Sequence, residues 1–172
     1  MSTTKRNCGF IGLGHLGVYL AASLVRAGHN VTITDLNKSL GDGLIAKGAK
    51  WANNAKEVAQ ASEVVFTCLP SPRAIETVVN GENGVFSGLA KGGTWIDMST
   101  NDRSETLRLG EIAAKLGVNS LESPVTGGVH KAAEGDITVL VGGDQKIFAA
   151  HKELLEAMGK PVIYVGELGS AA

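Results

Sequence analysis

A glycine-rich turn near the N-terminus constrains the fold of this chain more than any other feature of its sequence. The stretch GFIGLGHLG places Gly12, Gly14 and Gly17 in the spacing G-x-G-x-x-G. The apolar run 8–12 before the turn predicts a buried strand, and apolar residues at every fourth position after it predict a helix over 15–27. A strand, a glycine turn and a helix in this order are typical of the first unit of a βαβ fold.

The context of the turn indicates a bound dinucleotide, although one glycine motif is a weak signal in a chain with 23 glycines. A second strand is predicted over 31–35, and it ends in Asp35, 23 positions after Gly12. The dinucleotide fingerprint has an acidic residue at a spacing of about 20. Gly14 would let a pyrophosphate approach the backbone, where free N–H groups of the helix start would face it. The alternative is a plain βαβ turn without a ligand.

The residues around Asp35 favour NAD over NADP. A carboxylate at the end of the second strand accepts hydrogen bonds from both ribose hydroxyls and repels a 2′-phosphate. The next residues are Leu36 and Asn37, and no arginine follows that would bind such a phosphate. In the turn itself, His15 either covers the cofactor or faces solvent as a polar first-turn residue.

Strand-like and helix-like segments alternate along the rest of the chain. This alternation predicts an α/β fold, a Rossmann-like doubly wound and mostly parallel sheet with helices on both faces. We expect one domain over 1–166. The further predicted strands are 49–51, 63–69, 93–98, 118–123, 137–143 and 161–166, and the further predicted helices are 39–47, 54–62, 72–80, 102–117 and 144–158.

Composition argues against several classes of partner. The net charge is −1 and no basic run occurs, so we expect no nucleic-acid partner. No apolar stretch reaches the roughly 18 residues of a membrane helix, so we expect no membrane partner. Cys8 and Cys68 lie in apolar runs and are interpreted as reduced core thiols of a cytoplasmic protein. The four histidines are scattered, and we expect no metal site.

Three later motifs are each ambiguous alone. LPS (69–71) and IDMST (96–100) fit either a ligand crevice or a helix start with its N-cap. PVTGG (124–128) places a hydroxyl and two glycines at a predicted helix start, which suits either a small carboxylate or simple capping. Together with the glycine turn, AAEGDITVLVGGD and VGELGSAA, this ordered set resembles the β-hydroxyacid dehydrogenase family. That family includes 3-hydroxyisobutyrate dehydrogenase and tartronate semialdehyde reductase, and it is related to 6-phosphogluconate dehydrogenase.

The resemblance implies a role for individual residues. The glycine turn would bind the pyrophosphate, Asp35 the adenosine ribose, and the later motifs the nicotinamide side and the substrate. Thr126 stands where the family usually has serine, and its extra methyl group narrows the pocket, so the identity of the hydroxy acid stays open. The predicted cofactor-binding residues are Gly12, Leu13, Gly14, His15, Leu16, Gly17, Asp35, Leu36, Asn37, Leu69, Pro70 and Thr100; those predicted for a small carboxylic-acid substrate are Thr126, Gly127 and Gly128.

The family pattern continues beyond the last residue of this chain. After the closing glycines the family has a few small residues, a lysine that handles the proton, and an all-helical domain. We therefore interpret 167–172 as the start of a truncated interdomain helix and expect an NAD-dependent 3-hydroxyacid dehydrogenase domain that is inactive alone. Lys131 is an alternative candidate for the acid or base of the reaction. The full-length form is expected to be a homo-oligomer, and the apolar segment 162–165 to promote self-association. A non-enzymatic dinucleotide-binding module, and a domain for another ligand class, are the alternative functions.

Overall fold

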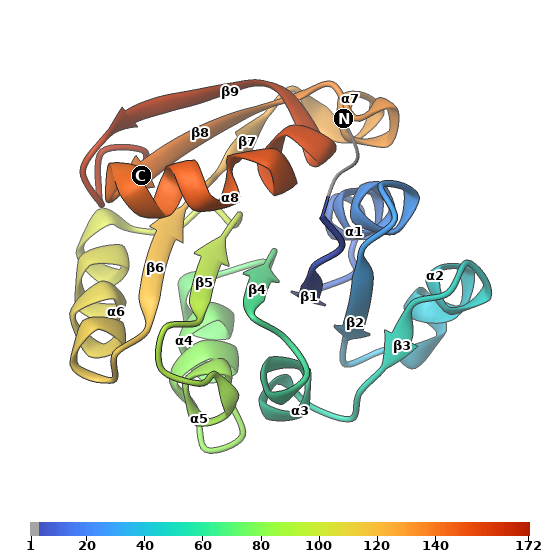
Figure 1. Ribbon diagram of the computed structural model, residues 1–172, viewed down its shortest axis with the longest axis horizontal. Helices are drawn as coiled ribbons and strands as arrows, with labels where there is room; N and C mark the ends of the chain where they lie inside the picture. Colours follow the sequence, from blue (N-terminus) through green and yellow to red (C-terminus); the bar gives the residue numbers. More distant parts are fainter. Residues whose placement is uncertain (1–3) are drawn as a thin grey trace.

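A nine-stranded sheet forms the centre of the computed structural model, which describes residues 4–172 (Figure 1). Six strands run parallel in the order β3-β2-β1-β4-β5-β6. From β1 to β3 the strands are added on one side of β1, and from β4 to β6 they are added on its other side. The topological switch point, at which doubly wound sheets bind their ligands, therefore lies between β1 and β4. The strands are β1 Asn7–Ile11, β2 Asn30–Thr34, β3 Lys50–Trp51, β4 Val64–Thr67, β5 Thr94–Asp97, β6 Asn119–Glu122, β7 Val125–Thr126, β8 Ile137–Gly143 and β9 Gly159–Gly166.

The last third of the sheet departs from the parallel pattern. β8 runs antiparallel to both β6 and β7, and β9 then pairs with β8 in parallel. Figure 1 shows β8 and β9 side by side at the orange and red end of the chain. Ile163 and Val165 on β9 are 42% and 40% exposed, in the segment where the sequence predicts exposed apolar surface.

Helices cover both faces of the sheet, as the alternation predicts. One core cluster packs α1 and α8 against the sheet, and the second packs α3, α4, α5 and α6 against the other face. The helices are α1 Gly17–Arg26, η1 Lys38–Gly41, α2 Asp42–Ala46, α3 Ala55–Gln60, α4 Pro72–Asn80, α5 Val85–Gly88, α6 Arg103–Lys115, α7 Gly128–Glu134 and α8 Gln145–Met158. None of the helices within 4–172 is both long and apolar enough to cross a membrane.

Three local predictions need correction. The predicted helix 39–47 is divided into the 3-10 helix η1 and the short helix α2. The helix α5 was not predicted, because its four residues are too few to show a period. Thr126 was expected at a helix start, but it lies in β7 opposite Thr138, and α7 begins two residues later at Gly128. Two residues of strand do not show the alternation by which a sequence signals a strand.

Candidate functional site

Close backbone contacts hold the glycine turn in place after β1. Gly12 has φ +100°, and a Cβ atom there would lie 2.2 Å from the carbonyl oxygen of Cys68. A Cβ atom on Gly17 would lie 2.0 Å from the carbonyl oxygen of Gly12. Both positions therefore require glycine, because any side chain would push the turn away from β4 or the helix away from the turn.

Gly14 has a different reason to be glycine. Its backbone is exposed, and a Cβ atom there would meet no protein atom within 4 Å. The hydrogen-bond ladder of α1 starts when Val18 N–H donates to the Gly14 carbonyl (3.2 Å), so the earlier N–H groups have no partner one turn back. The side chain of His15 is exposed, in agreement with the solvent-facing alternative. The turn thus presents an open backbone surface at the positive end of a helix.

Asp35 follows β2, and its carboxylate is fixed beside the turn. Its Oδ2 atom accepts a hydrogen bond from Leu13 N–H (2.7 Å), and its Oδ1 atom accepts one from Asn37 N–H (2.9 Å). The carboxylate keeps further lone pairs for a ligand. The Leu36 side chain is fully exposed beside it. The Leu13 side chain is buried at 1% exposure, so only its backbone belongs to the site.

The ends of β4 and β5 form the next part of the crevice. Leu69 N–H donates to Ser99 Oγ (2.8 Å), which joins the LPS and IDMST motifs. Asp97 Oδ1 accepts from Thr67 Oγ1 (3.0 Å) and from Ser99 N–H (3.1 Å). Burial raises the pKa of the Asp97 carboxyl to about 6, although these hydrogen bonds act in the opposite direction. Pro70 and Thr100 remain exposed at the edge.

A small cavity of about 40 Å³ lies behind Thr100. Two of its lining residues carry a buried side-chain atom with no hydrogen-bond partner within the described residues: Glu122 Oε2 and Asn101 Nδ2. Neither residue belongs to a recognisable spacing, so the sequence alone does not single them out. The lining residues are Asp97, Ser99, Thr100, Asn101, Thr106, Glu122, Pro124, Ala171 and Ala172.

The predicted substrate residues are all exposed. Thr126, Gly127 and Gly128 follow Pro124, which itself lines the cavity. Gly127 and Gly128 have φ values of +135° and +83°, conformations that side chains rarely adopt. The structure therefore places the PVTGG motif at the same edge of the sheet as Thr100, with its hydroxyl open to solvent. Lys131 is also exposed.

The two cysteines are the remaining sequence candidates, and Cys68 directly follows β4. Cys8 is buried and free, and burial raises the pKa of its thiol to about 12. Cys68 is also free and partly buried. Across residues 4–172, no three His, Cys, Asp or Glu side chains converge in a way that could hold a metal ion.

A family model describes nearly this whole arrangement. Residues 7–166 match the NAD-binding domain of 6-phosphogluconate dehydrogenase. The chain belongs to this family. The predicted resemblance to the β-hydroxyacid dehydrogenases and the Rossmann-like fold class are therefore confirmed, as is NAD as the cofactor of the domain family.

Curated relatives of this NAD-binding domain include several dehydrogenases. The chain is 38% identical over 171 residues to a probable mitochondrial 3-hydroxyisobutyrate dehydrogenase of Dictyostelium discoideum, covering 99% of this chain and 53% of that protein. It is 38% identical over 161 residues to 2-hydroxy-3-oxopropionate reductase of Escherichia coli, covering 94% of this chain and 55% of that protein. The chain thus spans about half the length of these relatives.

Solved structures give the same result for the fold. The 3-hydroxyisobutyrate dehydrogenase of Mycobacterium tuberculosis with L-serine superimposes with a TM-score of 0.91 at 29% identity, over 97% of this chain and 56% of that one. A protein named Psf3, in complex with NADP+ and 2-OPP, also gives 0.91 at 30% identity, over 95% of this chain and 58% of that one. One structural neighbour of this chain thus holds NADP+.

Proposed function

We propose that this chain is the NAD-binding part of an oxidoreductase that transfers hydride between NAD and a small 3-hydroxy acid. The observation that carries the cofactor half is the Asp35 carboxylate, which is held beside the glycine turn by Leu13 N–H. It stands where the ribose of the adenosine half would lie, and its charge opposes a 2′-phosphate. NAD is therefore the preferred cofactor, although a relative binds NADP+.

The residues of this chain bind and orient the cofactor, which supplies the hydride chemistry. The turn from Gly12 to Gly17 receives the pyrophosphate on its open backbone side above Gly14. The exposed Leu36 side chain and Asn37 border the adenosine half. Leu69, Pro70 and Thr100 border the nicotinamide half.

The substrate half of the proposal rests on PVTGG. The Thr126 hydroxyl and the backbone of Gly127 and Gly128 hold the substrate carboxylate at the edge that Thr100 shares. Several relatives are named for small hydroxy or oxo acids, which supports this class. None of these three residues can carry the proton at neutral pH, because a threonine hydroxyl is too weak an acid. The residues assigned to the substrate thus supply no acid or base for the reaction, so these 172 residues are proposed to bind ligands without turnover.

Cell location and assembly belong to the same proposal. Two free cysteines, of which Cys8 is buried, fit a reducing compartment such as the cytoplasm. A longer form is proposed to be a homo-oligomer, and the exposed Ile163 and Val165 side chains offer apolar surface for self-association.

A non-enzymatic dinucleotide-binding module is the second candidate function. The chain is 31% identical over all 172 residues to a human protein named cytokine-like nuclear factor N-PAC, of which it covers 31%. That relative carries the same kind of domain under a name that denotes no dehydrogenase. A module of this kind would bind the cofactor and leave the PVTGG surface without a substrate.

Cofactor titration tests the first half of the proposal. We expect the native chain to bind NADH at least about tenfold more tightly than NADPH, because Asp35 repels the 2′-phosphate. Asp35→Asn removes the charge and keeps the shape, so it should reduce this ratio about tenfold. Asp42→Asn, at an exposed position of α2, is the matched control and should leave the ratio unchanged. Tighter binding of NADPH by the native chain contradicts the NAD assignment.

Turnover assays test the second half. The native chain is incubated with NAD and a panel of small 3-hydroxy acids, and NADH formation is followed by absorbance. We expect binding of NADH and no turnover. Turnover would contradict the proposal that these 172 residues lack the acid or base of the reaction, and failure to bind NADH would exclude both candidate functions.

A further inference from the structure

The chain returns to the centre of the sheet after the edge strand β9. A turn over 167–170 closes with Ser170 N–H donating to the Glu167 carbonyl (3.0 Å). Leu168 packs on α6 so closely that a Cβ atom on Gly110 would lie 2.4 Å from its Cδ2 atom. Ala171 and Ala172 then form one wall of the cavity behind Thr100. Residues 169–172, which we call the return segment, therefore border the predicted nicotinamide side.

Glu122 holds the return segment through its carboxylate. It is the last residue of β6 and is only 4% exposed. Its Oε1 atom accepts a hydrogen bond from Ala171 N–H at 2.5 Å. The backbone N–H groups of Gly169 and Ala172 also lie near the carboxylate and favour its ionised form. A charged acceptor facing several N–H groups binds backbone more strongly than a neutral one.

The surroundings leave room for this carboxylate and for a solvent contact. β8 passes Glu122 at Gly142, where a Cβ atom would lie 2.5 Å from Oε1. The second oxygen, Oε2, has no protein partner within the described residues, and Glu122 is one of the residues that line the cavity. At about 40 Å³ the cavity is large enough for a water molecule, which would give this oxygen a partner.

We propose that Glu122 is a positioning residue that anchors the return segment as a wall of the nicotinamide side, opposite Thr100. The proposal rests on the proposed function, because that function assigns Thr100 to the nicotinamide. Loss of the anchor would release Ala171 and Ala172 and widen the space around the nicotinamide ring. The adenosine end, at Asp35, would be unaffected because β1, β4 and β5 separate β2 from β6.

A pair of ligands separates this role from general destabilisation. NADH contains the nicotinamide ring and ADP-ribose does not. For Glu122→Ala and the similarly sized Glu122→Gln we expect NADH to bind about tenfold and about threefold more weakly, with ADP-ribose affinity unchanged. Glu167→Gln, an exposed neighbour of the return segment, should leave both affinities unchanged. Equal weakening of both ligands, or no weakening of either, overturns the proposal.

A second readout needs no ligand. The amide resonance of Ala171 in the native chain should move with pH as Glu122 titrates, above the usual range because burial raises the pKa of this carboxyl. Asp97 and Arg103 are the charged groups whose fields couple to it. Glu122→Gln should abolish this movement and Glu167→Gln should preserve it.

The ligand titrations and the Ala171 resonance distinguish failure of the proposed function from failure of the anchoring by Glu122. If the native chain binds neither NADH nor ADP-ribose, the proposed function fails, and the Ala171 titration then decides the anchoring by itself. An Ala171 resonance that titrates equally in the native chain and in Glu122→Gln overturns the anchoring whatever the ligands do.

Discussion

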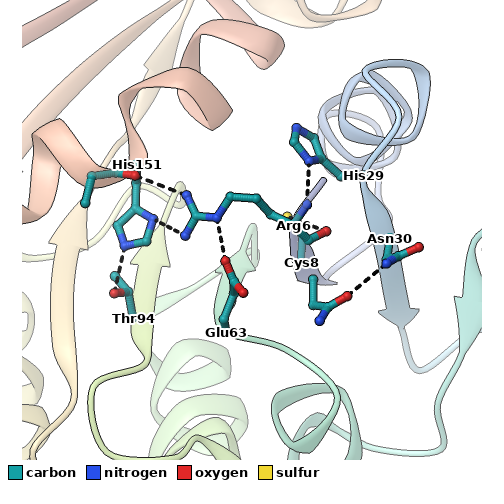
Figure 2. A network of polar contacts seen from close by, with 9 residues as sticks. Arg6, Cys8, His29, Asn30, Glu63, Thr94 and His151 are labelled. Carbon is teal, nitrogen blue, oxygen red and sulfur yellow. Dashed lines mark hydrogen bonds and ion pairs between the residues drawn. The ribbon is translucent and has the colours of Figure 1, made fainter. Parts of the chain in front are cut away.

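The two ends of the parallel strands differ in whether their buried polar side chains have hydrogen-bond partners. At the amino ends, Arg6 joins three elements that are far apart in the sequence (Figure 2). It donates to Glu63 Oε1 (2.5 Å), to the Ala150 carbonyl (3.1 Å) and to His151 Nδ1 (3.1 Å). Arginine only donates, so His151 Nδ1 accepts, and the proton on Nε2 is donated to Thr94 Oγ1 (2.9 Å). These contacts tie α8 to the start of β1 and β5.

The carboxyl ends leave polar groups unpaired. Of the four buried side-chain atoms without a partner within residues 4–172, three lie just beyond or at the end of β5 and β6: Asn101 Nδ2, Glu122 Oε2 and Ser123 Oγ. The fourth, His29 Nε2, lies before β2. Buried polar groups without partners cost stability, so their concentration at one edge marks the edge that a ligand or water completes. The contacts at the amino ends tie distant elements together, whereas the carboxyl ends form the edge to which the proposed function assigns the ligands.

The largest effect is expected from Gly12→Ala in the glycine turn, at the carboxyl end of β1. The new Cβ would meet the Cys68 carbonyl oxygen at 2.2 Å in a backbone conformation with φ +100°. We expect a loss of roughly 3 kcal/mol or more in the free energy of unfolding, measured by denaturant titration.

Gly14→Ala is the matched control for this prediction. No protein atom would lie within 4 Å of its Cβ, so stability should change by less than about 1 kcal/mol while NADH affinity falls about tenfold or more. A stable Gly12→Ala variant, or a Gly14→Ala variant that binds NADH normally, would break the distinction between a packing glycine and a binding glycine.

Acid should weaken the amino-end network next. Burial and the nearby Arg6 charge lower the pKa of His151 from 6.5 to about 4. The folded state therefore prefers the neutral ring, and its stabilising effect is present above pH 6.5 and lost as the pH falls toward 4. At about 1.4 kcal/mol per unit, the loss is on the order of 3 kcal/mol. Urea denaturation at pH 7 and pH 4 measures it.

His151→Gln isolates this contribution from other groups that titrate in the same range. The variant should be less stable at pH 7 but should lose less stability on acidification than the native chain. His15→Gln, at an exposed position of the glycine turn, should follow the native pH dependence. The same acid loss in native and His151→Gln proteins would show that the network does not depend on a neutral His151.

The smallest effect is expected at the exposed PVTGG motif. Thr126→Ala should change the free energy of unfolding by less than about 0.5 kcal/mol, because the side chain is exposed. NADH affinity should also stay within twofold in a fluorescence titration, since the residue is assigned to the substrate. A loss of stability above about 1 kcal/mol would place Thr126 with the packed amino ends instead.

Local patterns were enough to predict the arrangement of the glycine turn and Asp35, whose role in binding stays a prediction. The strand, the glycine turn and Asp35 follow one another within 28 residues, and each has a local steric or electrostatic reason to be where it is. Gly28 follows the predicted helix 15–27, at a position where helices commonly end on a glycine of positive φ, and its φ is +94°. The helix α4 over Pro72–Asn80 matches its predicted bounds, because Ser71 caps it and proline opens it.

Contacts between distant residues explain what could not be predicted. The pairing of β8 with both β6 and β7 depends on which strand edge stays open after β6, and no spacing in the sequence encodes that choice. Arg6 and His151 are 145 positions apart, and neither residue has a neighbouring pattern that points to the other.

The sequence by itself determined the family, the cofactor class and the glycine turn, because steric and electrostatic requirements there act between near neighbours. Only the tertiary structure brought Glu122, Thr100 and Ala171 around one cavity. Their meeting depends on the order of strands in the sheet and on the path of the chain back from β9. Glu122 belongs to no recognisable sequence motif. The fold buries its carboxyl group, which raises its pKa, and brings Ala171 N–H within hydrogen-bond distance, and its proposed role follows from these two facts.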